Sequence, residues 1–288
     1  MASTRQLKSR IRSVKSTKQI TKAMQMVAAS KMRRAQDATK ASSSYTHEAR
    51  ELLTYLAGQG VTADHRWFVK RPVKTRLLIV VASDKGLAGA YNTNLLKEYL
   101  AALREDEANG VQNETIAVGR KAAQFVTRLK DTTVLGSYED LPDYPEGIQF
   151  QAILNTAKEA YEEQRVDAVD VIFTRFVSSI TQTAETVRLF PAGFVKTDVR
   201  EWVKNAAYEP SLEQVLDIAA YRLISAQLYQ ALLDARASEH SMRMIAMKNA
   251  TDNASDLVDD LTLAMNKARQ GAITQELSEI SAGVEAMK

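Results

Sequence analysis

The fold is decided by residues 211–288, which read SLEQVLDIAAYRLISAQLYQALLDARASEHSMRMIAMKNATDNASDLVDDLTLAMNKARQGAITQELSEISAGVEAMK. The stretch contains no proline and only two glycines, so no residue in it is a strong helix breaker. Ser211 and Gln214 have the spacing of a capping box, which satisfies free backbone N–H groups at a helix start. We therefore predict one helix that begins after Pro210 and extends roughly 100 Å at 1.5 Å per residue.

Apolar residues recur along this helix at alternating steps of four and three. The series is Leu212, Leu216, Ala219, Leu223, Ala226, Leu233, Ala237, Met244, Met247, Ala254, Val258, Leu261, Met265, Ala268 and Ala272, and it is interrupted at Gln230, His240 and Thr251. Because no single globular core covers such a length, a seam with this spacing must pack against another long helix. At His240 we expect a tolerated polar residue near the surface. The alternative is a buried polar group that fixes the register of the two helices.

Proline and glycine divide the chain into three segments, 1–58, 73–200 and 211–288, and all five prolines lie between Pro72 and Pro210. The first segment carries apolar stripes of helical spacing and should form a second long helix that stops near Gly58. Only the two terminal helices are long enough to bury each other's seams. We predict an antiparallel coiled coil with both chain ends at one tip, the inserted domain at the other tip, and the end of the longer C-terminal helix projecting alone.

The central segment changes its hydrophobic period and alternates strands with helices. The expected strands are 77–82, 114–119, 132–135, 168–176 and 183–190, and the expected helices are 93–107, 120–130 and 148–165. This alternation predicts a Rossmann-like α/β domain with a largely parallel sheet, whose last two strands form a hairpin.

Composition excludes several classes of protein. The chain has no cysteine, so disulfides, thiolate zinc sites and thiol catalysis are excluded. Its longest apolar run, Leu77–Ala82, is far shorter than the ~20 residues that span a bilayer, and no signal-peptide pattern opens the sequence. We expect a soluble, cytoplasmic protein that can dock on a membrane complex. The formal net charge is +3, but residues 1–40 hold eleven Lys and Arg against one acidic residue, which indicates an acidic partner surface.

Two rival functions deserve comparison. The turn Lys85–Ala90 follows a strand where a phosphate loop would lie, but it matches neither G-x-G-x-x-G nor G-x-x-x-x-G-K-[ST], which favours a plain strand-to-helix turn over a nucleotide-binding enzyme. The basic N-terminal helix could neutralise nucleic acid or an anionic membrane surface as a coiled-coil scaffold, yet it lacks aromatic residues for base stacking before Tyr45. The three histidines have no metal-ligand spacing, so we predict no metal site. The residues also show no pattern that selects a cofactor, and the enzymatic interpretations are weak.

Three stretches carry a family resemblance that covers the whole chain in order. RIRSVKSTKQITKAMQMVAASKMRRAQ (residues 10–36), SDKGLAGAYNTN (83–94) and MKNATDNASDLVDDLTLAMNKARQGAITQELSEISAG (247–283) resemble the γ subunit of F-type ATP synthases. The resemblance implies a central rotating shaft, one copy per complex, that couples proton-driven rotation of the membrane c-ring to ATP synthesis or hydrolysis at the β subunits. The implied partners are α, β, ε and the c-ring, with no nucleic acid. The implied location is the cytoplasmic face of the bacterial plasma membrane.

The resemblance also assigns contact residues. Met24 and Arg243 match positions that couple the shaft to β. Arg269, Gln270, Thr274 and Glu276 match a polar cluster near the tip that engages a β loop, and Tyr208 and Glu209 resemble a foot that meets the c-ring.

Overall fold

The computed structural model describes residues 4–60, 62, 65–129, 132–144, 147–193, 198–205, 209 and 211–286, without the side chains of 40–47, 49, 50 and 283–286. The chain forms two compact units, Met1–Ala28 with Arg243–Lys288, and Ala29–Met242. The two long helices, α1 (Thr4–Gly58) and α6 (Leu212–Ala286), each run through both units. This division cuts both helices, so the three-segment boundaries drawn from the sequence stay a prediction.

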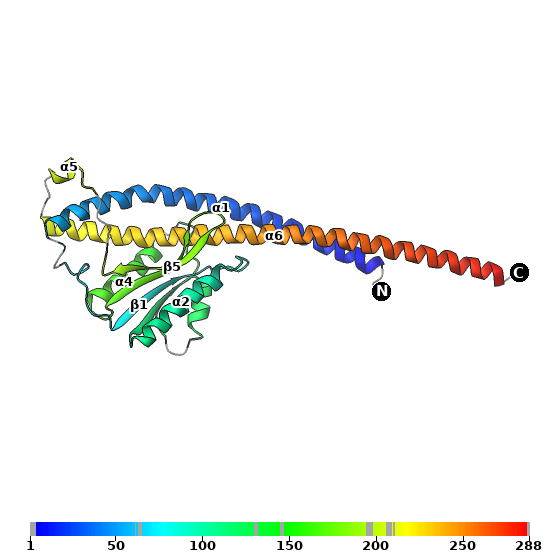
Figure 1. Ribbon diagram of the computed structural model, residues 1–288, viewed down its shortest axis with the longest axis horizontal. Helices are drawn as coiled ribbons and strands as arrows, with labels where there is room; N and C mark the ends of the chain where they lie inside the picture. Colours follow the sequence, from blue (N-terminus) through cyan, green and yellow to red (C-terminus); the bar gives the residue numbers. More distant parts are fainter. Residues whose placement is uncertain are drawn as a thin grey trace. The chain divides into compact units, whose positions relative to one another are not determined.

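In the first unit the first part of α1 and the part of α6 that follows Arg243 lie side by side as antiparallel helices (Figure 1). The Thr21 and Thr251 hydroxyl oxygens are 2.8 Å apart although 230 residues separate them in sequence. The buried side chains of this pair are Leu7, Ile11, Thr21 and Ala28 from α1, and Met247, Thr251 and Ala254 from α6. The predicted coiled-coil pairing is confirmed, and the end of α6 continues beyond the first residues of α1 (Figure 1).

The second unit contains a five-stranded sheet in the order β3-β2-β1-β4-β5. Its strands are β1 (Thr75–Val81), β2 (Gln112–Val118), β3 (Thr133–Tyr138), β4 (Ala168–Phe176) and β5 (Gln182–Phe190). The pairs among β1 to β4 are parallel, whereas β5 runs antiparallel to β4. The prediction of a largely parallel sheet that ends in a hairpin is therefore confirmed.

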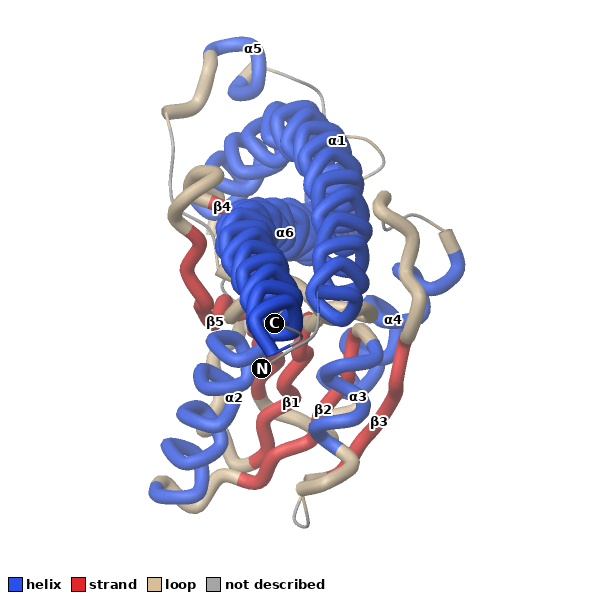
Figure 2. Tube along the Cα trace, turned by 90° about the vertical axis from the view of Figure 1, so that its right-hand side faces the viewer, coloured by secondary structure: helices blue, strands red, loops and turns tan. Residues whose placement is uncertain are grey.

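Helices cover both faces of the sheet (Figure 2). On one face α2 (Tyr91–Ala108) and α3 (Arg120–Val126) pack against a cluster that includes Leu78, Val80 and Ile172. On the other face α4 (Ile148–Glu162) and α6 share one buried cluster with Leu77 and Ile79. A short helix, α5 (Glu201–Lys204), precedes α6. Because successive strand residues point to opposite faces, the near-continuous apolar strands fit a sheet buried on both sides.

The sheet domain lies along the flank of α6 rather than at the far tip of the helix pair, where the sequence placed it. The Tyr221 hydroxyl donates to Gln151 Oε1 at 3.0 Å, and the Ser241 hydroxyl donates to the Ser179 carbonyl at 2.7 Å, so contacts extend over several turns of α6. The reason is a second apolar stripe on α6, beside the seam. It includes Ala220, Ile224, Leu228, Leu232 and Ala235, which cover the part of the sheet face left open by α4.

Candidate functional site

The predicted tip cluster occupies the exposed end of α6. The side chains of Arg269, Gln270, Thr274 and Glu276 are all exposed, and so is every residue from 271 to 282. The Thr274 hydroxyl donates to the Gln270 carbonyl at 2.9 Å, so this side chain is satisfied within its own helix. The four predicted residues therefore lie close together on about two turns of one exposed helix end.

Large apolar side chains are interspersed with these polar groups. Leu263, Leu277 and Ile280 are 71%, 62% and 65% exposed, and Ile273 is also exposed. Single exposed apolar residues are common, but a group on one helix end marks an interaction site. The end of α6 has the composition of a surface that a partner covers.

The other predicted coupling residues are also in the first unit. Met24 on α1 and Arg243 on α6 are both partly buried. Seven basic side chains of α1 are exposed, and none of them forms an ion pair with a carboxylate in the described part of the chain. They are Arg5, Lys8, Arg10, Arg12, Lys15, Lys18 and Lys22. This half of α1 therefore presents positive charge that the chain itself does not neutralise.

The predicted foot is only partly described. Glu209 is exposed, and Tyr208 lies outside the described residues. Nearby, the Arg200 guanidinium contacts both oxygens of Glu51, which is almost fully buried in α1, and Arg200 also packs over the ring of Trp202. The Glu51–Arg200 pair fixes the segment before α5 to α1. Sequence reasoning missed it because the two residues are distant in the chain and no motif surrounds either one.

The carboxyl end of β1 is covered by α6. Residues of α6, including Leu232, Ala235 and Arg236, lie against the carboxyl end of β1 and the following turn, and the remaining cavity measures about 10 Å³. A cavity of this size holds no more than about one water molecule, so α6 fills the space next to the end of β1. Among the described residues, no three His, Cys, Asp or Glu side chains are grouped to hold a metal ion.

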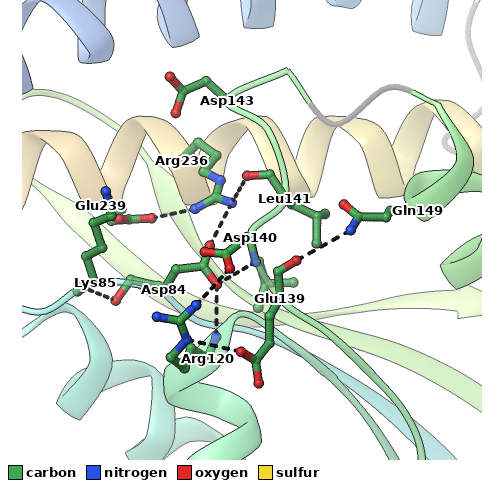
Figure 3. A network of polar contacts seen from close by, with 12 residues as sticks. Asp84, Lys85, Arg120, Glu139, Asp140, Leu141, Asp143, Gln149, Arg236 and Glu239 are labelled. Carbon is green, nitrogen blue, oxygen red and sulfur yellow. Dashed lines mark hydrogen bonds and ion pairs between the residues drawn. The ribbon is translucent and has the colours of Figure 1, made fainter.

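A polar network joins this turn to α6 (Figure 3). Asp84 Oδ1 accepts from the backbone N–H groups of Arg120 and Asp140, each at 3.0 Å, and Arg236 Nη2 donates to Asp84 Oδ2 at 3.3 Å. Burial alone would raise the pKa of Asp84, but these N–H groups and the guanidinium hold it below its ordinary value. The close approach of the two strand ends requires Gly119, whose φ is +90° and where a Cβ would lie 2.2 Å from the Ala82 carbonyl oxygen.

His240 corrects an expectation. Its side chain is only 7% exposed, and its Nε2 lies 3.4 Å from Asp143 Oδ1, so it is not a surface residue. The burial follows from the loop after β3, which passes over α6 at this point. The burial that the alternative interpretation expected is therefore present, whereas a role of His240 in fixing the register of the two helices stays a prediction.

No helix among the described residues is long and apolar enough to cross a membrane.

Comparison with known proteins gives full-length matches. A family model described as ATP synthase matches residues 3–287. The ATP synthase gamma chain of Xylella fastidiosa strain M12 is 38% identical over 288 residues, covering 100% of both chains. The ATP synthase gamma chain of Stenotrophomonas maltophilia strain R551-3 matches with the same identity and coverage.

Solved structures share the fold. A chain of the Euglena gracilis mitochondrial ATP synthase rotor aligns with a TM-score of 0.65 and 19% identity, covering 94% of this chain and 98% of its own length. A chain from a second Euglena gracilis assembly, which contains OSCP, F1 and the c-ring, aligns with a TM-score of 0.67 and 21% identity over 99% of this chain and 94% of the other.

Proposed function

Because this chain belongs to the family of ATP synthase gamma chains, we propose that it is the central rotating shaft of an F-type ATP synthase. In this role the helix pair stands inside a ring of α and β subunits and turns with the membrane c-ring. Rotation of the asymmetric shaft drives the catalytic sites on β through their successive states. The full-length family match leaves the alternative of a basic scaffold for nucleic acid or lipid without support.

The observation that carries the proposal is the pairing of the two chain ends, followed by an α6 end without cover. A packed pair of long helices resists bending and can transmit torque. A ring of subunits around the helix would bury its exposed apolar side chains, Leu263, Leu277 and Ile280. The exposed basic side chains of α1 would attract acidic loops of that ring. Because this attraction requires no specific binding pocket, the shaft can rotate past the loops while the contact is kept.

The partners follow from this role. One copy of the chain binds the α and β subunits through its tip, and its other end contacts ε and the c-ring. The chain is a non-catalytic subunit and binds no cofactor, since the chemistry takes place on β. It is peripheral to the cytoplasmic face of the bacterial plasma membrane as part of the complex.

The site residues have distinct roles. Met24 and Arg243, partly buried on the two helices of the first unit, face the β loops that respond to rotation. The tip cluster of Arg269, Gln270, Thr274 and Glu276 engages a β loop through exposed polar groups. Tyr208 and Glu209 form the foot against the c-ring.

Charge reversal at the tip tests the proposal. In the reconstituted complex we expect Arg269→Glu to reduce ATP synthesis and ATP-driven proton pumping more than ATP hydrolysis, because the shaft then slips against β. Arg128→Glu is the matched control, since Arg128 is also an exposed arginine and lies just after α3 in the sheet domain. Pumping per ATP in Arg269→Glu equal to that of the control would contradict the assignment.

A further inference from the structure

The loop after β3, residues 139–144, is held by both the sheet and the two long helices; we call it the strap loop. At its start Arg120 of α3 pairs with Glu139 at 3.0 Å and with Asp140 at 2.7 Å. At its end Asp143 contacts Lys31 of α1 at 2.9 Å and His240 of α6 at 3.4 Å. The strap loop is therefore fixed to α3, α1 and α6 within the second unit.

Arg236 lies at the centre of this arrangement (Figure 3). Its Nη2 donates to the Leu141 carbonyl at 2.7 Å and to Asp84 Oδ2 at 3.3 Å, and its Nη1 donates to Glu239 at 3.0 Å. Its side chain is only 14% exposed. A guanidinium with donors in a rigid fork can hold several acceptors in one geometry, which an ammonium cannot. Arg236 therefore ties α6 to the β1 turn and to the strap loop at the same time.

Apolar contact alone would fix this junction less well. Packed apolar surfaces have no direction, so they allow small sliding along the helix axis and around it. Hydrogen bonds and ion pairs that converge on one carboxylate fix register and rotation, because each depends steeply on distance and angle. Asp84 provides such a point, since it accepts from the ends of β2 and β3 and from α6.

We propose that Asp84, Arg236 and the strap loop form a torque clamp, which makes the sheet domain turn with the helix pair as one rigid body. The clamp rests on the proposed shaft function and adds positioning residues to it. Through the clamp, rotation of the sheet domain reaches α6 at Arg236 and His240 and α1 at Lys31, in addition to the contacts of α6 at Tyr221 and Ser241. Without the clamp the rotor still assembles, but its torsional stiffness is lower. Part of each rotational step then twists the sheet domain relative to the helices instead of turning them.

The experiment measures torsional stiffness in the assembled complex. The chain has no cysteine, so Asn109→Cys, at an exposed position after α2, gives a single site for a bead that is attached before assembly. With the catalytic ring immobilised, the angular variance of the bead during pauses reports the stiffness between the sheet domain and the tip. A role in stability alone would change the yield of complex but not the variance of molecules that have assembled.

Arg236→Met keeps the side-chain volume and removes the donors, and we expect it to raise the variance roughly twofold, because two of the three polar links from α6 to Asp84 and the strap loop are lost. Arg165→Met is the control, since the Arg165–Glu114 pair lies wholly within the sheet domain, and it should leave the variance unchanged. An unchanged variance in Arg236→Met, or an equal rise in the control, would overturn the proposal.

If the complex with Arg236→Met does not assemble, a second variant tests the clamp. Asp143→Asn weakens the strap loop at a half-exposed residue, and it should raise the variance by a smaller factor. If it assembles with unchanged variance, the proposal also fails. Failure of the shaft function is distinguishable, because the sheet domain of the unmutated complex would then not rotate during ATP hydrolysis.

Discussion

Two stretches of the same helix differ completely in their surroundings. In α6, residues 231–241 are buried on every side except at the partly exposed Arg236, whereas residues 271–282 are exposed on every side. Both stretches contain apolar residues at helical spacing, among them Leu232 in the first and Leu277 in the second. Apolar spacing in the sequence therefore marks the parts of a helix that could pack against another element. Whether such a part is buried depends on which other parts of the chain lie beside it. The uncovered stretch is the one for which a partner must be sought.

The largest expected effect comes from truncating a side chain in the covered stretch. Leu232 is 2% exposed and packs against the sheet domain, so Leu232→Ala should lower the free energy of unfolding by about 2–5 kcal/mol. Leu277→Ala is the matched variant in the uncovered stretch and should change it by less than about 0.5 kcal/mol. Denaturant titration of the free chain measures both. An equal loss in the free energy of unfolding for the two variants would contradict the conclusion that only the first stretch is buried in the free chain.

A buried carboxyl in the covered stretch predicts a pH dependence. Burial raises the pKa of Asp234 from 3.8 to about 6, against the opposing effects of Arg175 and Gln230. The folded chain then binds more protons than the unfolded chain between these values. Stability is therefore lost as the pH rises from about 4 to about 6 and stays low above it.

Asp234→Asn removes this dependence. At pH 8 the variant should be more stable than the unmutated chain by on the order of 2–3 kcal/mol, since each pKa unit corresponds to 1.36 kcal/mol. Near pH 4 the two should be similar. Denaturant midpoints at both pH values test this, and a stability difference that does not change with pH would show that Asp234 is not the titrating group.

A smaller effect is expected at the only polar pair that the described seam of the first unit buries. Thr21→Val or Thr251→Val should each cost about 1 kcal/mol, because the remaining hydroxyl loses its cross-helix partner. The double variant should cost less than the sum, since both hydroxyls are then replaced by methyl groups of similar shape. Thermal unfolding of the four chains completes the cycle. Strict additivity would mean that the two hydroxyls do not interact.

Periodicity was enough to predict the five strands and the long helices, but not the short helix α5. The seam of α6 is buried at Leu216, Leu223 and Leu233, and the two strands of the β4–β5 hairpin match the expected ranges to within one residue, because these features depend on local spacing. The placement of the sheet domain on the flank of α6 depends on a second apolar stripe that the dominant seam concealed. Periodicity along one helix does not say which of two stripes meets which neighbour.

The clamp residues were beyond sequence reasoning. Asp84 and Arg236 are 152 residues apart. Asp84 lies in the stretch 83–94 that carries the family resemblance, but nothing in that stretch points to Arg236 as its partner. The burial of His240 was one of two alternatives, and the sequence could not decide between them because the burial depends on a loop that contacts the helix. The contact roles of Met24, Arg243 and the tip cluster rest on family resemblance, and they stay predictions until a complex tests them.

The most direct test is a disulfide cross-link between α1 and α6. Thr21→Cys with Thr251→Cys introduces the only cysteines in the chain, at side chains whose hydroxyl oxygens are 2.8 Å apart. Oxidation of the assembled complex should link the two helices and leave ATP synthesis and hydrolysis unchanged, because both helices belong to one rotating body. Failure to form the link, or a link that stops turnover until it is reduced, would contradict the account.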